Sequence, residues 1–273
     1  MGVNAPQRIG LPDIQGQIDG RGIAIDEVGI KGVRYPMSIL SGGEAVPTVA
    51  TLSMTVALPA SAKGTHMSRF IEVLEGHSLP LDPERFRDLV RAMIERLDAR
   101  SGTVEMSFPY FVTKAAPVSG VKSRLDYEVS WRGTLGADGA YSFRMRVVVP
   151  ATSLCPCSKE ISAYGAHNQR SHITLDAELA GDMAIEELIA VAESSASCEV
   201  YGLLKRVDEK FVTEMAYDNP KFVEDLVRDA ALALERDRRV GGYLVEAENF
   251  ESIHNHSAFA RLARPGAIPG GSR

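Results

Sequence analysis

Two cysteines and two histidines lie close together in a chain of otherwise ordinary composition. Cys155 and Cys157 flank a proline, and His167 and His172 follow shortly after them. Thiolate and imidazole together are ligands that zinc and similar divalent metals prefer, so the segment predicts a metal site. The polar residues around it suit an anionic or hydrogen-bonding substrate better than a protein core: Ser153, Ser158, Lys159, Asn168, Gln169, Arg170 and Ser171.

The spacing of the cysteines argues against a purely structural zinc site. Zinc knuckles use Cys-x-x-Cys, whereas a single residue separates Cys155 from Cys157. The alternative is a pair of small apolar residues at a turn after a buried strand, and the nearby His167 favours the metal. Three protein ligands with one open position would form a catalytic site, in which the metal lowers the pKa of bound water.

Remote segments offer further ligands, because metal ligands gather in space rather than in sequence. His254 and His256 lie two residues apart at the end of a strand pattern and share a face, although surface imidazoles on a turn would look the same. Carboxylates occur at 208, 209 and 214 in the charged segment 204–214, which could also be a solvated loop. Glu224 follows the start of the last helical pattern, where an exposed glutamate is the alternative.

A carboxylate among the ligands would loosen the preference for zinc and admit manganese or iron. The lone histidines His66 and His77 are more typical of surface or core contacts. The residues alone therefore predict a metal-dependent hydrolase or lyase that acts on a polar small molecule.

Bulk properties exclude several classes of protein. The chain has 273 residues, of which 45% are hydrophobic and 24% are charged, as in globular proteins. No stretch reaches the roughly 18 apolar residues of a membrane span, and residues 1–17 show no signal peptide. Three cysteines make no disulfide framework, and Cys198 is expected to be a buried thiol, so we expect a cytoplasmic protein. The net charge of -6 argues against nucleic-acid binding.

The elements that must position these residues follow two periodicities. Apolar and polar residues alternate in four runs, which predicts antiparallel strands with one wet face: 50–58, 124–132, 142–149 and 173–179. Two helices are predicted to open with a proline, at Asp82-Pro83 and Asn219-Pro220, and a third to span 184–197. Strand-like runs follow the first two, at 104–112 and 242–250.

This order predicts an α+β protein made of two similar halves, each an antiparallel sheet with helices on one face. A Gly-Ala-Asp-Gly turn at 136–139 marks the boundary. We expect a disordered segment at 1–20, modules at 21–137 and 138–264, and a flexible tail at 265–273. Open sheet edges in such halves invite closure by oligomerisation.

Longer motifs resemble one known family, GTP cyclohydrolase type IB, the prokaryotic enzyme that opens pterin synthesis for folate. The resemblance covers nearly all of residues 20–264. The motifs that carry it are Gly64-Thr-His-Met-Ser-Arg-Phe70, Leu154-Cys-Pro-Cys-Ser-Lys159, Gly165-Ala-His-Asn-Gln-Arg-Ser-His-Ile173, Lys205-Arg-Val-Asp-Glu-Lys210, Val212-Thr-Glu-Met-Ala-Tyr217, Asn219-Pro-Lys-Phe-Val-Glu-Asp225 and Glu251-Ser-Ile-His-Asn-His256.

The resemblance implies a tunnelling fold with two modules per chain, a homotetramer, and active sites between subunits. It implies that GTP and water become 7,8-dihydroneopterin triphosphate and formate, after a metal-activated water attacks C8 of the purine. Zinc or manganese, or else iron, would be held by four residues: Cys155, His167, Glu209 and His254.

Further roles follow from the same resemblance. Cys155, His167 and Glu251 would be catalytic, and His167 is either a lasting metal ligand or a proton shuttle. Glu224 would anchor the guanine, since a carboxylate accepts two parallel hydrogen bonds from N1–H and the 2-amino group. The triphosphate candidates are Arg170, Lys159, Lys205 and Arg206.

Two alternatives stay open. The nitrile reductase of the queuosine pathway shares the implied fold but consumes NADPH, and its nicotinamide-binding segment is not evident here. A non-catalytic, zinc-stabilised oligomeric binding module would have a closed four-ligand site.

Overall fold

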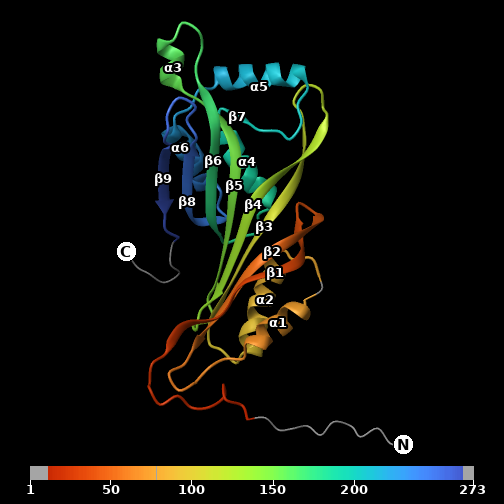
Figure 1. Ribbon diagram of the computed structural model, residues 1–273, viewed down its shortest axis with the longest axis vertical. Coiled ribbons are helices and arrows are strands. Elements are labelled where there is room, and N and C mark those ends of the chain that lie inside the picture. The colour runs from red at the N-terminus through yellow and green to blue at the C-terminus, as the bar shows by residue number, and fades with distance from the viewer. Residues whose placement is uncertain (1–11, 78, 267–273) are drawn as a thin grey trace, which may run out of the picture.

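The computed structural model describes residues 12–77 and 79–266, and a single twisted antiparallel sheet dominates it (Figure 1). The hydrogen-bonded order is β1-β2-β3-β4-β5-β6-β8-β9, and the short β7 pairs with β5. The strands are β1 (Ile25–Ser41), β2 (Glu44–Leu58), β3 (Gly102–Ala115), β4 (Lys122–Leu135), β5 (Tyr141–Leu154), β6 (Asn168–Leu179), β7 (Cys198–Glu199), β8 (Val240–Asn249) and β9 (Ala258–Arg264).

Helices cover one face of this sheet. They are α1 (Met67–Glu75), α2 (Pro83–Arg96), α3 (Pro156–Ile161), α4 (Ile185–Ser195), α5 (Arg206–Asp218) and α6 (Val223–Arg236). Helix α2 packs on β3 to β5, α4 on β5 and β6, and α6 on β8 and β9, whereas α3 and α5 lie at one end of the sheet (Figure 1). The predicted α+β class with an antiparallel sheet is confirmed. No helix in the described ranges is long and apolar enough to cross a membrane.

The alternation seen in the sequence builds the core. In β5, Phe143, Met145, Val147 and Val149 are buried beneath the helices, while the residues between them face away. The four predicted strand runs are therefore confirmed, and so are the runs at β3 and β8. Around Trp131, the rings of three phenylalanines pack edge-on at centroid distances of 5.6 to 5.7 Å: Phe86, Phe108 and Phe143.

The proline-started helix α2 forms as predicted. Asp82 is its N-cap and accepts a hydrogen bond of 2.8 Å from the backbone N of Arg85, and Pro83 occupies the first turn, where its missing N–H costs nothing. The predicted helix at 184–197 is also confirmed, as α4.

The start predicted for the last helix is wrong. Asn219 is the C-cap of α5, and its side-chain amide donates to the carbonyls of Ala196 and Ser197 at 3.0 and 3.2 Å. Helix α6 begins at Val223 instead, and its Asp225 carboxylate accepts from the backbone N of Phe222 at 2.9 Å. The Asn-Pro pair therefore ends one helix instead of opening the next, because its amide has partners elsewhere in the fold.

The charged segment 204–214 is not a solvated loop. It forms most of α5, whose first turn is held by Asp208. The turn at 136–139 lies between β4 and β5 as expected, and Gly139 has a φ of 80°, which favours glycine.

The order of two strands, two helices and two strands in β1–β4 recurs in β5–β9, with α3, α5 and β7 added. Of the segments expected to be loose at the ends, residues 1–11 and 267–273 lie outside the described residues. Near the start of the described part, Ile18 forms an isolated bridge with Ala62.

Candidate active site

Cys155 and His167 meet where β5 ends and β6 begins. The backbone N of Cys155 donates to the carbonyl of His167 at 3.1 Å. Cys155 is also the N-cap of α3, and its Sγ accepts from the backbone N of Ser158 at 3.4 Å. The thiolate form of cysteine is the one that binds metals and attacks electrophiles.

The imidazole of His167 is held from one side. Its Nδ1 lies 2.9 Å from Oε1 of Gln169, and its backbone N donates to Ser158 Oγ at 3.2 Å. Among the described residues, Nε2 of His167 has no hydrogen-bond partner, so this nitrogen is the one free to meet a metal or a substrate.

The loop after β8 lies beside the first residues of β6. The backbone N of Phe250 donates to the carbonyl of Arg170 at 3.0 Å, which ties the loop to β6. In the loop, Nε2 of His254 lies 3.6 Å from Oε2 of Glu251, and the rings of His254 and His256 stack at 5.0 Å. The His254 side chain is 48% exposed, so its ring remains accessible.

His172 takes no part in this cluster. It faces away from the core, and its ring packs edge-on against Phe250 of the neighbouring segment at 4.9 Å. Cys157 is exposed, whereas Cys198 is buried as predicted.

Helix α5 carries Glu209 and Arg206, and Lys205 is its N-cap; all three are exposed. The neighbouring Asp208 is fully buried, and its carboxylate accepts from the backbone N of Val118, from the backbone N and hydroxyl of Ser119, and from the backbone N of Lys205. Burial favours the neutral acid, but these hydrogen bonds outweigh it and hold the pKa of Asp208 well below its usual range. Asp208 thus anchors the helix that presents Glu209.

The connection from α5 to α6 passes beside Cys155. The backbone N of Lys221 donates to the carbonyl of Leu154 at 3.0 Å. Glu224 follows as the second residue of α6 and is exposed, so it lies in the first turn of this helix. Its carboxylate is therefore accessible on a rigid element.

Two clefts flank the first residues of β6. One, of about 480 Å³, is lined in part by Arg170, Gln169 and Glu199, and the other, of about 510 Å³, by Tyr164 and Tyr217. Asn168 and Thr213 border both.

Of the basic candidates, exposed Arg170 faces a cleft. Lys159 already has partners, because its Nζ donates to the carbonyl of Tyr217 and lies 4.2 Å from the centre of the Tyr217 ring.

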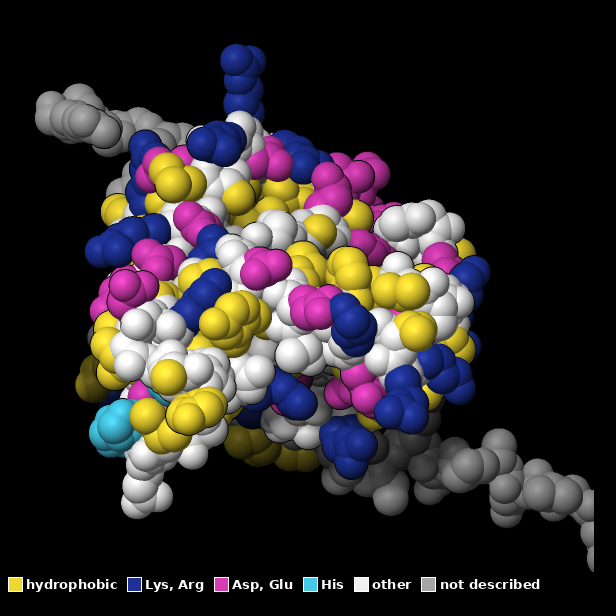
Figure 2. All heavy atoms as spheres, turned by 90° about the horizontal axis from the view of Figure 1, so that it is seen from above, with side chains coloured by type: hydrophobic (Ala, Val, Ile, Leu, Met, Phe, Trp, Pro, Cys, Tyr) yellow, Lys and Arg dark blue, Asp and Glu magenta, His cyan; other side chains and the backbone are white. Residues whose placement is uncertain are grey.

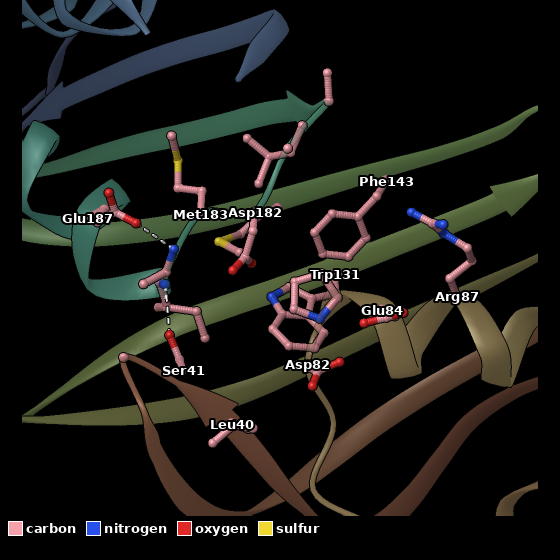
Figure 3. A pocket seen from close by; sticks show the side chains of 18 of the residues that line it. Leu40, Ser41, Asp82, Glu84, Arg87, Trp131, Phe143, Asp182, Met183 and Glu187 are labelled. Carbon is pink, nitrogen blue, oxygen red and sulfur yellow. Dashed lines mark hydrogen bonds between the residues drawn. The ribbon is translucent and has the colours of Figure 1, made fainter. Parts of the chain in front are cut away.

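Another cavity, of about 730 Å³, is larger than these two clefts and lies elsewhere (Figure 3). It lies between the β1–β2 turn, the start of α2 and the segment before α4, and Trp131 and Phe143 line its wall. None of its described lining residues is a cysteine or histidine. Its edge is structural: Ser41 Oγ accepts from the backbone N of Ile185 at 2.9 Å, and Glu187 accepts from the backbone N of Ala184 at 2.8 Å. The volume of a cavity alone therefore does not indicate where the candidate catalytic residues lie.

The proposed metal ligands are only partly assembled in one chain. Cys155 and His167 are neighbours, but Glu209 and His254 are on other segments. Within residues 12–77 and 79–266, no group of three or more His, Cys, Asp or Glu side chains is arranged to hold a metal ion.

The surface at this end is mixed in character. Viewed end-on, hydrophobic side chains are interspersed with both signs of charge (Figure 2). On α5, Val207, Phe211 and Met215 follow each other at every fourth residue and are 54%, 42% and 43% exposed, so they form an apolar row.

The long antiparallel sheet, with helices on one face and polar residues gathered at one end, is that of a tunnelling-fold protein. The crystal structure of uricase from Arthrobacter globiformis aligns with it at a TM-score of 0.52, covering 91% of this chain and 95% of that chain at 7% sequence identity. Identity this low shows the fold alone.

The sequence then defines the family. The family model described as type I GTP cyclohydrolase folE2 matches residues 11–260, and the chain belongs to this family. GTP cyclohydrolase FolE2 of Paraburkholderia xenovorans (strain LB400) is 60% identical over 255 residues, 93% of this chain and 95% of the relative. That of Azoarcus sp. (strain BH72) is 56% identical over 263 residues, 96% and 98% of the two chains. The resemblance found in the motifs is confirmed.

The expectation that Ser153, Gln169 and Ser171 suit a substrate better than a protein core is wrong, because all three are buried, and the buried Asn249 was not singled out from the sequence. Continuing the alternation of β5, β6 and β8 to this end places polar residues at core-facing positions: Ser153, Gln169, Ser171 and Asn249. A polar residue where the pattern demands an apolar one was the available signal.

Proposed function

We propose that this chain is a metal-dependent GTP cyclohydrolase that converts GTP and water to 7,8-dihydroneopterin triphosphate and formate, the first step of pterin and folate synthesis. Its family membership over residues 11–260 carries the proposal. The contact between Cys155 and His167 supports it, because the two residues with the strongest metal chemistry are held side by side.

The donor set fits a divalent metal. Cys155 Sγ faces a backbone N–H, and His167 keeps Nε2 free, so both have a lone pair to offer. We assign Cys155, His167, Glu209 and His254 as ligands of zinc, manganese or iron. When bound, the metal supplies Lewis acidity that makes a water molecule nucleophilic near neutral pH.

The remaining roles belong to the chain's own groups. Glu251, next to His254, holds and moves protons at the purine ring, and His167 shares this role only if its Nε2 is not a lasting metal ligand. Glu224 accepts hydrogen bonds from N1–H and the 2-amino group of guanine. Arg170, Lys205 and Arg206 bind the triphosphate, and Lys159 contributes only if it leaves Tyr217.

We propose a homotetramer with active sites at subunit interfaces. Glu209 is exposed and His254 is half-exposed, so a second copy could bring the missing ligands together. The apolar row on α5 and the outer strands β1 and β9 offer surfaces for this contact. The halves 21–137 and 138–264 would be tandem modules. Three free cysteines fit a reducing cytoplasm, where we propose that the reaction runs.

The decisive experiment incubates the purified protein with GTP and measures formate and the pterin product. We expect one formate per GTP with no nicotinamide cofactor, loss of activity with a strong chelator, and recovery with zinc or manganese. Turnover that survives complete metal removal contradicts the mechanism. NADPH oxidation with a deazapurine nitrile would instead support the nitrile reductase, and metal binding without turnover the binding module.

A further inference from the structure

Four polar side chains lie in the core beneath the candidate site. Ser153 and Ser171 are 0% exposed, Asn249 is 3% and Gln169 is 7%. They occupy the core-facing positions at one end of three neighbouring strands, β5, β6 and β8. Farther along, the same faces carry apolar residues such as Ala151, Ile173 and Ala247. Burying polar groups is costly unless each has a partner, so a fully bonded chain is expected here.

The distances define that chain. Gln169 Nε2 donates to Ser153 Oγ at 2.8 Å, and Ser153 Oγ lies 2.8 Å from Ser171 Oγ. Ser171 Oγ in turn lies 2.7 Å from Oδ1 of Asn249. The carbonyl oxygen of Asn249 can only accept, so it takes the single hydroxyl proton of Ser171, and the Ser153 hydroxyl donates to Ser171. Every contact along this chain then has one donor and one acceptor.

The direction of these hydrogen bonds determines which ring nitrogen of His167 carries the proton. Since the amide nitrogen of Gln169 is occupied by Ser153, its carbonyl Oε1 faces Nδ1 of His167 at 2.9 Å. A carbonyl oxygen only accepts, so Nδ1 carries a proton, and in the neutral ring Nε2 then keeps its lone pair. We infer that Gln169 is a positioning residue: it fixes the Nδ1–H tautomer of His167 and aims Nε2 into the site.

The same chain joins His167 to the loop after β8. Asn249 is the last residue of β8, and its backbone carbonyl accepts from the backbone N of Glu251 at 3.0 Å. Strand β6, which carries Gln169 and directly follows His167, and the loop that carries Glu251 and His254 are therefore joined by one set of hydrogen bonds. A change at Gln169 acts on the imidazole directly, while a change at Asn249 acts through the loop.

The first test uses metal-free protein without substrate, so its outcome does not depend on the proposed function. Solid-state NMR of protein labelled with ¹⁵N-histidine, with His167 assigned from the His167→Gln variant, reports which ring nitrogen is protonated. We expect Nδ1–H in the wild type and in Gln169→Glu, which keeps an acceptor for Nδ1. In Gln169→Leu, which has none, we expect Nε2–H. Nε2–H in the wild type overturns the inference, and this spectrum needs no variant of Gln169 to fold.

The second test concerns metal binding and rests on the proposed function. Partners that orient a ligating histidine are worth roughly 10–100-fold in metal affinity. We expect Gln169→Leu to bind zinc that much more weakly in a chelator competition, and Gln169→Glu to stay within about threefold of the wild type. Thr174→Val is the matched control, because Thr174 is buried in the same strand on the other face. Equal zinc affinity in Gln169→Leu and the wild type sinks the positioning role, whether or not GTP is the substrate.

Discussion

The hydroxyl of Ser119 donates a hydrogen bond of 2.6 Å to the carboxylate of Asp208, which joins the turn after β3 to the first turn of α5. Because the backbone N–H groups of Val118 and Ser119 point at the same carboxylate, the contact is a cage of donors rather than a single bond. Glu209 comes next in the chain, so its direction depends on this cage.

We expect Asp208→Asn to destabilise the fold and to loosen α5, since an amide nitrogen would then face donors. The pKa of Asp208 is lowered in the folded protein, so its contribution to stability is fully present above the usual carboxyl pKa and decreases as the pH falls through it towards the folded value. Thermal unfolding at several pH values should show a gap between wild type and variant that is largest near neutral pH and narrows below about pH 4. The exposed Asp126→Asn is the control; a gap that does not change with pH would contradict the assigned charge.

A second buried cluster joins the two halves of the sheet. Lys114 of β3 is 9% exposed, and its Nζ lies 2.7 Å from Glu193 of α4 and also contacts Glu199 of β7. Tyr127 donates to Glu193 at 2.7 Å. Burial raises the pKa of Glu193, and the hydrogen bonds from Lys114 and Tyr127 act in the opposite direction. The lysine therefore stabilises the negative charge of the carboxylates in this cluster.

Lys114→Met should cost up to about 3–5 kcal/mol of unfolding free energy at pH 8, because it leaves the largely buried Glu193 and the partly exposed Glu199 without their cation. Those carboxyls then have raised pKa values, so the penalty is full above these values and declines as the pH falls and the groups take up protons. Chemical denaturation from pH 8 to pH 5 measures this. Lys122→Met, at an exposed position of β4, should stay near the wild type. A Lys114→Met penalty that grows towards pH 5 would be incompatible with the cluster as described.

The strands and α2 could be predicted because local patterns decide them. In β5 the alternation of Phe143, Met145 and Val147 matches burial residue by residue, and Asp82-Pro83 has one compatible role. Asn219-Pro220 has two compatible roles, since asparagine suits either end of a helix. Its amide bonds to carbonyls more than twenty residues away along the chain, and no local pattern contains that information.

Sequence patterns could likewise predict the site only where its residues lie close together along the chain. The cysteine and histidine motif predicted that Cys155 and His167 share a metal; their backbones are in contact, and the shared metal stays a prediction. The position of Glu209 depends on Asp208 and on a turn some 90 residues earlier, and that of Asn249 on Ser171. Polar residues at core-facing strand positions were the one available sign of the buried chain, but their partners come from three strands.

The two cysteines of the Cys-Pro-Cys motif should behave differently. Cys155 receives the backbone N–H of Ser158 and contacts His167, whereas Cys157 is exposed in α3. We expect Cys155→Ala to lose formate release and most bound metal, and Cys157→Ala to keep both. Metal content by atomic emission, together with activity, checks this. Equal metal in wild type and Cys155→Ala would remove Cys155 from the ligand set.

Glu224 is expected to select guanine through its carboxylate. In Glu224→Gln, one acceptor becomes a donor that faces a donor of the base, a mismatch worth about 1–3 kcal/mol. That corresponds to about 5- to 150-fold weaker binding of GTP. Inosine triphosphate lacks the 2-amino group, so the wild type should prefer GTP, and the variant should lose most of that preference.

The chain offers a matched control for Glu224 in its other half. Glu84 is also an exposed second residue of its helix, α2, so Glu84→Gln makes the same chemical change at an equivalent helix position. Steady-state kinetics with GTP and inosine triphosphate on the three proteins separates a specific contact from a general effect of charge. We expect Glu84→Gln to match the wild type with both nucleotides. If Glu224→Gln retains the wild-type preference for GTP, the guanine contact must be assigned to another residue, because a carboxylate paired with N1–H and the 2-amino group cannot be replaced by an amide without loss.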